Sequence, residues 1–242
     1  MTFDPAAAWA ALVGSPIFGL GLTLLVYQAA MALYERTGRH PVLNPVLVTM
    51  LVIIGLLVLT GISYDTYFTG ARMVYLLLGP ATVALAVPLY RQLPALLRAW
   101  PAVLAGILAG SAVALTSAVL IARELGASRV TQLSLAPKSV TTPIAMAVSE
   151  HIGGHPALTA VLVVLTGVFG AMAGGWILDL ARIRAPAARG LALGTAAHAF
   201  GTTRALQEGE TQGAFSGLAI GLAGLVTALL TPLAIGWLVS GK

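Results

Sequence analysis

Long stretches without a charged side chain constrain this sequence more than any other feature. Residues 99–122, 156–178 and 211–241 contain no lysine, arginine, aspartate or glutamate. A helix needs about 20 apolar residues to cross the hydrocarbon core of a bilayer. Helices also satisfy their own backbone polar groups, as lipid requires. These stretches therefore predict membrane-spanning helices.

The composition excludes most soluble proteins. Apolar residues make up 58% of the chain and charged residues 9%, whereas a soluble domain carries about 25% charged residues. An outer-membrane barrel would alternate apolar and polar residues within strands of about ten residues. The uninterrupted apolar runs lack this alternation, so the sequence does not predict a barrel. The net charge of +5 comes from arginines between the runs. Because they are placed to face lipid headgroups, we expect no nucleic-acid partner.

Charges and prolines divide the chain into about eight apolar segments. They lie near residues 8–34, 42–61, 73–90, 101–122, 130–149, 156–178, 190–203 and 213–239. The first, second, fourth, sixth and eighth are long enough to span a bilayer, and the other three are shorter or interrupted. We therefore expect an all-α membrane protein with a single polytopic transmembrane domain over residues 1–242.

The third and fifth segments contain residues that favour broken helices. Gly79 and Pro80 interrupt the third segment, and Pro137 and Pro143 interrupt the fifth. Proline removes a backbone donor and clashes with the preceding turn, and unwound backbone at membrane depth must be buried in protein or line a wet cavity. We therefore expect discontinuous or re-entrant helices around a polar site, an arrangement typical of secondary transporters.

The same two segments resemble each other. LGPATVALAVPL in the third aligns with LAPKSVTTPIAM in the fifth, so that Pro80 matches Pro137 and Thr82 matches Ser139. A third, weaker match falls on Gly194. One interpretation is an internal repeat of a broken helix, as in transporter halves, and the other is two unrelated kinked helices.

Lys138 lies in the middle of an apolar segment, close to Ser139, Thr141 and Thr142. A cation at membrane depth costs roughly 2.5 to 3.5 kcal/mol on insertion scales, so it normally faces a cavity or a partner. Together with backbone N–H groups freed at a helix break, these side chains predict an anion-binding site, with Thr82 as the matching hydroxyl of the third segment. The alternative is a lysine that reaches the membrane surface.

The seventh segment contains a second group of polar residues, centred on His198. Thr195, Thr202 and Thr203 accompany it, and Arg204 follows. On a continuous helix, Thr195, His198 and Thr202 share one face. We expect this face to border the Lys138 site and to contact the substrate, although His198 is also compatible with a packing role and Arg204 with an ordinary loop charge.

No feature of the sequence predicts an enzyme. All eight acidic residues fall at segment ends, and GAFSG around Ser216 lacks the order of a nucleophile elbow. Phosphate-binding and dinucleotide-binding fingerprints are missing, and the chain has no cysteine. We expect no catalytic residues, no metal and no cofactor.

Several stretches resemble the LrgB/CidB family of bacterial membrane proteins. They read LNPVLVTM with TGISYDTYF, LGPATVALAVPLYRQ, LAPKSVTTPIAMAVSEHIGG and ARGLALGTAAHAFGTTRALQEGETQGAFSGLA, within residues 42–240. The resemblance implies a multi-pass protein of the bacterial inner membrane. Because a chloroplast relative is similar to a glycolate/glycerate translocator, it also implies transport of small 2-hydroxy or 2-oxo monocarboxylates such as glycolate, glycerate, pyruvate or lactate.

Two function classes therefore stay open. The first is a secondary transporter that binds a carboxylate at a midplane site of broken helices. The second, implied by the antiholin-like description of the family, is a regulator of membrane permeability and murein hydrolase activity. The resemblance also allows a separate LrgA/CidA-type partner subunit. Small residues four positions apart, such as Gly170 and Gly174, favour close helix packing and leave room for the homodimer that we expect.

Overall fold

The structure is a computed structural model that describes most of the chain. It covers residues 4, 9, 11–38, 40–77, 80, 83, 84 and 86–239. All regular secondary structure among these residues is helical, which confirms the all-α prediction. The chain divides into two compact units, Met1–Ala84 and Leu85–Lys242, which we describe separately. The prediction of a single transmembrane domain stays a prediction.

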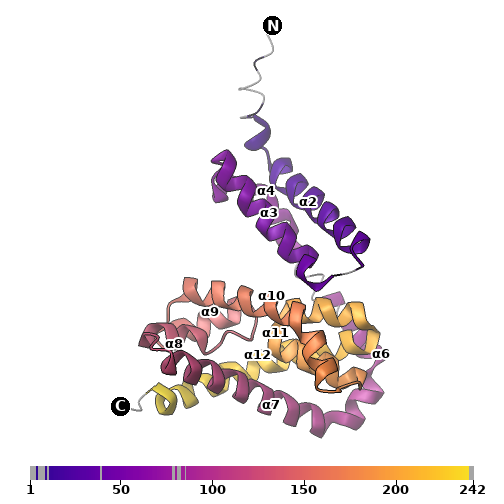
Figure 1. Cartoon of the computed structure of the whole chain (residues 1–242), viewed down its shortest axis with the longest axis vertical. Helices are drawn as coiled ribbons and strands as arrows, with labels where there is room; N and C mark the ends of the chain where they lie inside the picture. The colour runs from indigo at the N-terminus through magenta and orange to yellow at the C-terminus, as the bar shows by residue number, and fades with distance from the viewer. Residues whose placement is uncertain are drawn as a thin grey trace. The chain divides into compact units, whose positions relative to one another are not determined.

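The described residues of the first unit include three long helices and a short 3-10 turn. They are α2 (Pro16–Arg36), η1 (Pro41–Leu43), α3 (Pro45–Thr60) and α4 (Tyr64–Leu76). Helix α2 packs against both α3 and α4 (Figure 1). Gly19 and Gly70 allow α2 and α4 to approach closely, because a Cβ atom on either would collide with backbone of the other helix. The Thr23 and Tyr67 hydroxyls share a hydrogen bond of 2.8 Å across the same contact.

The second unit contains the remaining helices. They are α6 (Ala86–Arg91), α7 (Leu93–Glu124), α8 (Arg129–Leu135), α9 (Thr142–His151), α10 (Pro156–Leu180), α11 (Pro186–Glu208) and α12 (Glu210–Val239). Helices α7, α10 and α12, together with α2, are long and apolar enough to cross a membrane. These candidate spans fall in the first, fourth, sixth and eighth segments, where the sequence predicts helices of sufficient length. The second segment forms the shorter α3, of 16 residues.

The outer face of α12 is suited to lipid. Leu225, Leu229, Leu233 and Trp237 follow one another at helical spacing, and between 59% and 88% of each is exposed. Residues four positions apart share a helix face, so they form one continuous apolar stripe. A large exposed apolar surface of this kind indicates a membrane environment.

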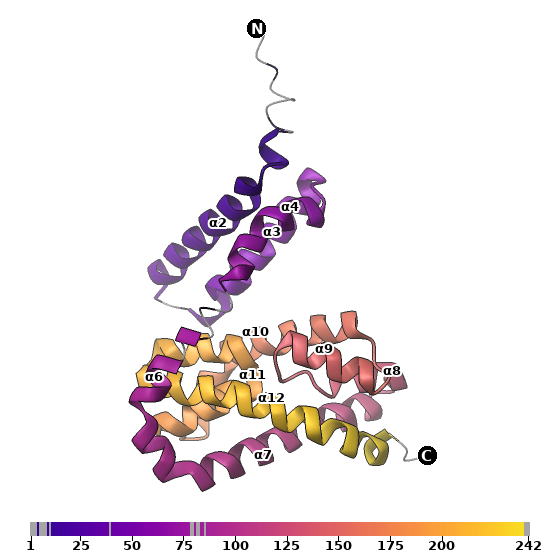
Figure 2. The ribbon, with the colours of Figure 1, turned by 180° about the vertical axis from the view of Figure 1, so that it is seen from behind.

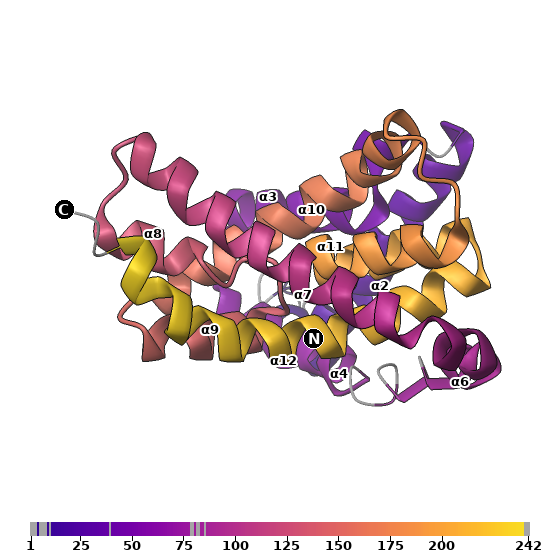
Figure 3. The same cartoon turned by 90° about the horizontal axis from the view of Figure 1, so that it is seen from below.

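The long helices of the second unit run between two ends, marked by α6 and α8 (Figures 1 and 3). At the α6 end, Arg91 pairs with Glu210 at the start of α12, at 3.4 Å. At the α8 end, Arg123 near the end of α7 donates to the Leu238 carbonyl of α12, at 3.3 Å. Helices α7 and α12 therefore run in the same direction, and Figure 2 shows α12 crossing the whole unit.

Helices α8 and α9 form a hairpin that starts and finishes at the α8 end. Pro137 lies in the non-helical link between them, and Pro143 lies in the first turn of α9, where proline is compatible with a helix. The Thr159 hydroxyl of α10 donates to Ser149 of α9 at 2.7 Å and lies 3.1 Å from the Ser134 carbonyl of α8. These bonds hold the base of the hairpin together.

Helix α11 is also a hairpin, although its two halves follow each other without a loop. Ala197 (φ −132°, ψ 18°) and His198 (φ 39°, ψ −127°) leave the helical region. Arg189 and Glu208 at its ends form an ion pair of 2.8 Å, whereas a straight helix would separate them by about 28 Å. The expected single face of Thr195, His198 and Thr202 is therefore wrong, because the chain reverses between them.

The two hairpins enter the unit from opposite ends. The α8–α9 hairpin starts at the α8 end, and α11 starts at the α6 end, where Arg189 also pairs with Asp179 near the end of α10. Their tips, around Lys138 and around His198, both lie beside the middle of α10. The break expected near Pro80 falls where Gly79 and Thr82 lie outside the described residues, and the internal repeat stays a prediction.

Candidate functional site

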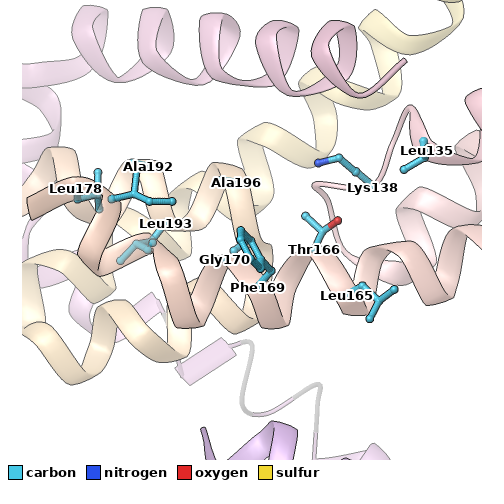
Figure 4. A pocket seen from close by; sticks show the side chains of 13 residues that line it. Leu135, Lys138, Leu165, Thr166, Phe169, Gly170, Leu178, Ala192, Leu193 and Ala196 are labelled. Atoms are coloured by element: carbon cyan, nitrogen blue, oxygen red, sulfur yellow. The ribbon is translucent and has the colours of Figure 1, made fainter. Parts of the chain in front are cut away.

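The tips of the two hairpins border one cavity of about 620 Å³. Leu135 and Lys138 line it from the α8–α9 hairpin, and Ala196 and Ala197 line it from α11. The wall between them comes from α10 and includes Thr166, as Figure 4 shows. The sequence suggested a site between the third and fifth segments, and the structure places the breaks of the fifth and seventh segments at this cavity.

Lys138 gives the cavity its charge. Among the described residues that line it, Lys138 alone is charged, and most of the others are apolar. The lysine side chain extends from the link between α8 and α9 into the cavity (Figure 4). A charge among apolar groups is stabilised by a partner of opposite sign, so this arrangement is suited to an anion.

Two helix N-termini follow the hairpin tips along the chain, although the described residues that line the cavity include none from either helix start. Helix α9 begins at Thr142, and Thr141 at its N-cap gives the first turn no side-chain hydrogen bond in the described structure. The second half of α11 begins after His198. The first N–H groups of a helix lack partners within it and carry partial positive charge. These helix starts carry partial positive charge close to the tips in sequence, and Lys138 supplies the charge at the cavity wall itself.

Glycines on α10 let the α11 tip approach closely. A Cβ atom on Gly167 would lie 2.7 Å from Cε1 of His198, and one on Gly174 would lie 2.6 Å from Cδ2 of Leu193. Both distances are well below van der Waals contact. The spacing of small residues in the sixth segment thus has a packing role, because it positions the break of α11 against α10.

His198 is buried and fixes the α11 tip. Its Nε2 atom lies 3.1 Å from the Val163 carbonyl oxygen of α10. A carbonyl only accepts hydrogen bonds, so Nε2 carries the proton. The Thr202 hydroxyl lies 3.1 Å from the His198 carbonyl and 2.7 Å from the Ser216 hydroxyl of α12. Both side chains therefore connect α11 to its neighbours.

The structure separates the other predicted residues. Ser139 is buried beside Lys138 in the same link, and Thr195 is buried two residues before the α11 break at Ala197. Thr203 is exposed and donates to the Ala199 carbonyl of its own helix. The Nε atom of Arg204 lies 3.3 Å from Oε1 of Glu208. This pair is near the base of the α11 hairpin and away from its tip.

The sequence analysis missed Thr166, which lines the cavity, and Ser111, a buried residue of α7. Thr166 lines the cavity and donates to the Leu162 carbonyl at 2.7 Å. Ser111 of α7 is 4% exposed, and its hydroxyl has no hydrogen-bond partner among the described residues. Both sit inside long apolar segments, where a lone hydroxyl residue has the same appearance as a packing residue.

Comparison with known proteins gives one consistent result. The model of the LrgB-like family matches residues 23–237. The uncharacterized protein YwbG of Bacillus subtilis (strain 168) is 40% identical over 222 residues, which are 92% of this chain and 98% of that protein. YxaC of the same strain is 37% identical over 217 residues, 90% of this chain and 94% of that protein. The antiholin-like protein LrgB of Bacillus cereus (strain B4264) is 33% identical over 219 residues, 90% of this chain and 95% of that protein. No solved structure matches the chain.

Proposed function

Because this chain belongs to the LrgB-like family, whose members are membrane proteins, we propose that it is a secondary transporter of small monocarboxylates. The proposed substrates are 2-hydroxy and 2-oxo acids such as glycolate, glycerate, pyruvate and lactate. The proposed location is the bacterial inner membrane. The observation that carries the proposal is Lys138 in a cavity bordered by the breaks of two opposed hairpins.

The chemistry of the cavity supports a small organic anion. Lys138 supplies one positive charge at the cavity wall, and a carboxylate can accept a charge-assisted hydrogen bond from it. The remaining wall is largely apolar, including Leu165 and Phe169, which suits a short carbon chain more than a polyanion.

The opposed hairpins also support transport rather than simple binding. In transporters of known architecture, broken helices meet at a central site, and motion of one element against another exposes that site to each side in turn. Here one hairpin enters from the α8 end and the other from the α6 end. In the proposed mechanism the α8–α9 hairpin and α11 close the cavity from opposite sides, and Lys138 neutralises the substrate during the exchange.

A second function is favoured by the description of relatives as antiholin-like. In this alternative the protein regulates membrane permeability and murein hydrolase activity, together with an LrgA/CidA-type partner subunit. Such a regulator acts through assembly in the membrane and requires no internal anion site. The cavity around Lys138 therefore favours the transporter.

Reconstitution distinguishes the two functions. Purified protein in liposomes should take up labelled glycolate, glycerate, pyruvate or lactate, and unlabelled acid inside should accelerate the uptake by exchange. An entrapped fluorescent dye should stay inside the same liposomes. Dye leakage without saturable acid uptake would contradict the transporter and support a role in permeability.

A further inference from the structure

The cavity between the hairpin tips offers a bound molecule very few polar side chains. Among the described residues that line it, only Lys138 and Thr166 have polar side chains, and the others are aliphatic, aromatic or glycine. An acid whose carboxylate contacts Lys138 therefore has one further side-chain partner in this wall for a second polar group. That partner is the Thr166 hydroxyl of α10.

Thr166 can be reached from the cavity. Its side chain is only partly buried, and Figure 4 shows it on the side of α10 that faces Lys138. Gly170 follows one helical turn later on the same face and also lines the cavity. Because glycine has no side chain, it leaves the neighbouring hydroxyl uncovered.

The proton of this hydroxyl already has a partner. The Oγ1 atom of Thr166 donates to the Leu162 carbonyl oxygen, one turn earlier in α10, at 2.7 Å. A threonine hydroxyl has one proton and two acceptor lone pairs. While the bond to Leu162 is in place, Thr166 therefore presents only an acceptor to the cavity.

An acceptor at this place distinguishes the two classes of acid that the proposed function includes. A 2-hydroxy acid carries a proton on its oxygen and can donate it to Thr166 without disturbing the Leu162 bond. The keto oxygen of a 2-oxo acid only accepts, so it would pair with Thr166 only if the hydroxyl proton turned away from Leu162. One hydrogen bond would then be lost for the one gained, whereas the 2-hydroxy acid gains a bond without losing any.

We propose that Thr166 sets the specificity of this cavity and favours 2-hydroxy acids over the corresponding 2-oxo acids. This inference rests on the proposed transport function. Lys138 binds the carboxylate, which both classes share, and so contributes to affinity but not to the choice between them. Thr166 accepts from the hydroxyl on carbon 2, and the apolar remainder of the wall contacts the carbon chain.

The test is calorimetric binding of lactate, pyruvate and propionate to the purified full-length protein. These acids differ only at carbon 2, which carries a hydroxyl, a keto oxygen or two hydrogens. Both enantiomers of lactate are measured, and the tighter one is compared. We expect the wild type to bind lactate about 3- to 10-fold more tightly than pyruvate or propionate, the range for one neutral hydrogen bond.

Two substitutions of Thr166 separate its hydroxyl from its shape. Thr166→Val removes the hydroxyl, so it should weaken lactate binding about 3- to 10-fold, abolish the preference over pyruvate and leave propionate binding unchanged. Thr166→Ser keeps the hydroxyl and should keep the preference. Thr116→Val on α7 is the matched control, because the Thr116 hydroxyl donates to the Ala112 carbonyl at the same distance of 2.7 Å but is not among the residues that line the cavity. It should bind all three acids as the wild type does.

Three results would overturn the assignment. The wild type binds pyruvate at least as tightly as lactate, or Thr166→Val keeps the wild-type preference, or Thr166→Val weakens lactate and propionate binding in the same proportion, as a purely structural role would require. A wild type that binds none of the three acids would instead overturn the transport function itself and this inference with it. Propionate keeps these failures distinguishable, because its binding requires the Lys138 charge but no partner at carbon 2.

Discussion

Arg189 and Glu208 form a two-point ion pair across the base of α11, with Nε–Oε2 at 2.8 Å and Nη2–Oε1 at 3.2 Å. The two residues are 19 positions apart in what is otherwise one helix. Their side chains are only 12% and 13% exposed. The pair therefore joins the beginning of the α11 hairpin to its end in a largely buried place.

Glu208→Gln should destabilise this hairpin. The substitution leaves the buried Arg189 guanidinium with one carboxylate partner, Asp179, and breaking a buried pair costs about 3 kcal/mol. We expect a clear fall in the midpoint of thermal unfolding in detergent. Glu210→Gln is the matched control, because its partner Arg91 is 67% exposed and such pairs contribute about 0 to 1 kcal/mol. Equal shifts in the two variants would contradict the role of the buried pair.

Lys138→Met and Lys138→Ala should abolish monocarboxylate binding without unfolding the protein. The lysine is the one charge among the described residues of the cavity wall, and methionine keeps most of its apolar length. Calorimetric titration with glycolate measures the loss, and the unfolding midpoint checks the fold. Arg184→Met, which removes an exposed arginine between α10 and α11, is the control and should bind normally. Unchanged affinity in either Lys138 variant would disprove the anion site.

His198→Ala should reduce transport by about 5- to 30-fold, as expected for the loss of one hydrogen bond of roughly 1 to 2 kcal/mol. The bond in question joins Nε2 to the Val163 carbonyl and positions the α11 tip. His198→Gln retains an N–H donor at a similar reach and should recover much of the transport rate. Initial uptake rates in liposomes measure both variants. Equal loss in the two would indicate that the imidazole itself contacts the substrate.

Gly167→Ala should disturb the site although glycine 167 carries no side chain. The new methyl group would lie 2.7 Å from atoms of both His198 and Phe200, and overpacking of this kind costs about 1 to 3 kcal/mol. We expect a lower unfolding midpoint and weaker glycolate binding. Gly221→Ala on α12 is the control, since no atom lies within 4 Å of the added Cβ, and alanine there should be neutral or stabilising.

The break at Pro137 and the break at His198 differ in how far the sequence indicates them. Pro137 and Lys138 in an apolar segment predict an interruption, because both are unfavourable in a continuous membrane helix. The α11 break falls in the sequence AAHAF, which contains neither proline nor glycine and is compatible with a helix. His198 adopts a positive φ there because contacts with α10 and α12 impose it.

The site is partly predictable for the same reason. Lys138 is conspicuous because a buried charge is rare, and His198 because it is one of four histidines. Thr166 becomes a candidate only when its place in the cavity wall is known, and Arg204 loses its place near the cavity once α11 folds back. Local sequence indicates which residues are costly to bury, whereas tertiary contacts decide which of them meet.

The bases of the two hairpins are held by different interactions, and this difference has a consequence for how each hairpin opens. Arg189 and Glu208 hold α11 by charge, whereas Ser134, Ser149 and Thr159 hold the α8–α9 hairpin by neutral hydrogen bonds. An ion pair that is this short and this little exposed is screened only weakly by dissolved ions, and separating it leaves a charge without its partner in a largely buried place. Opening α11 at its base therefore requires a charge to be rehydrated, whereas the base of the α8–α9 hairpin can exchange its neutral hydrogen bonds for bonds with water.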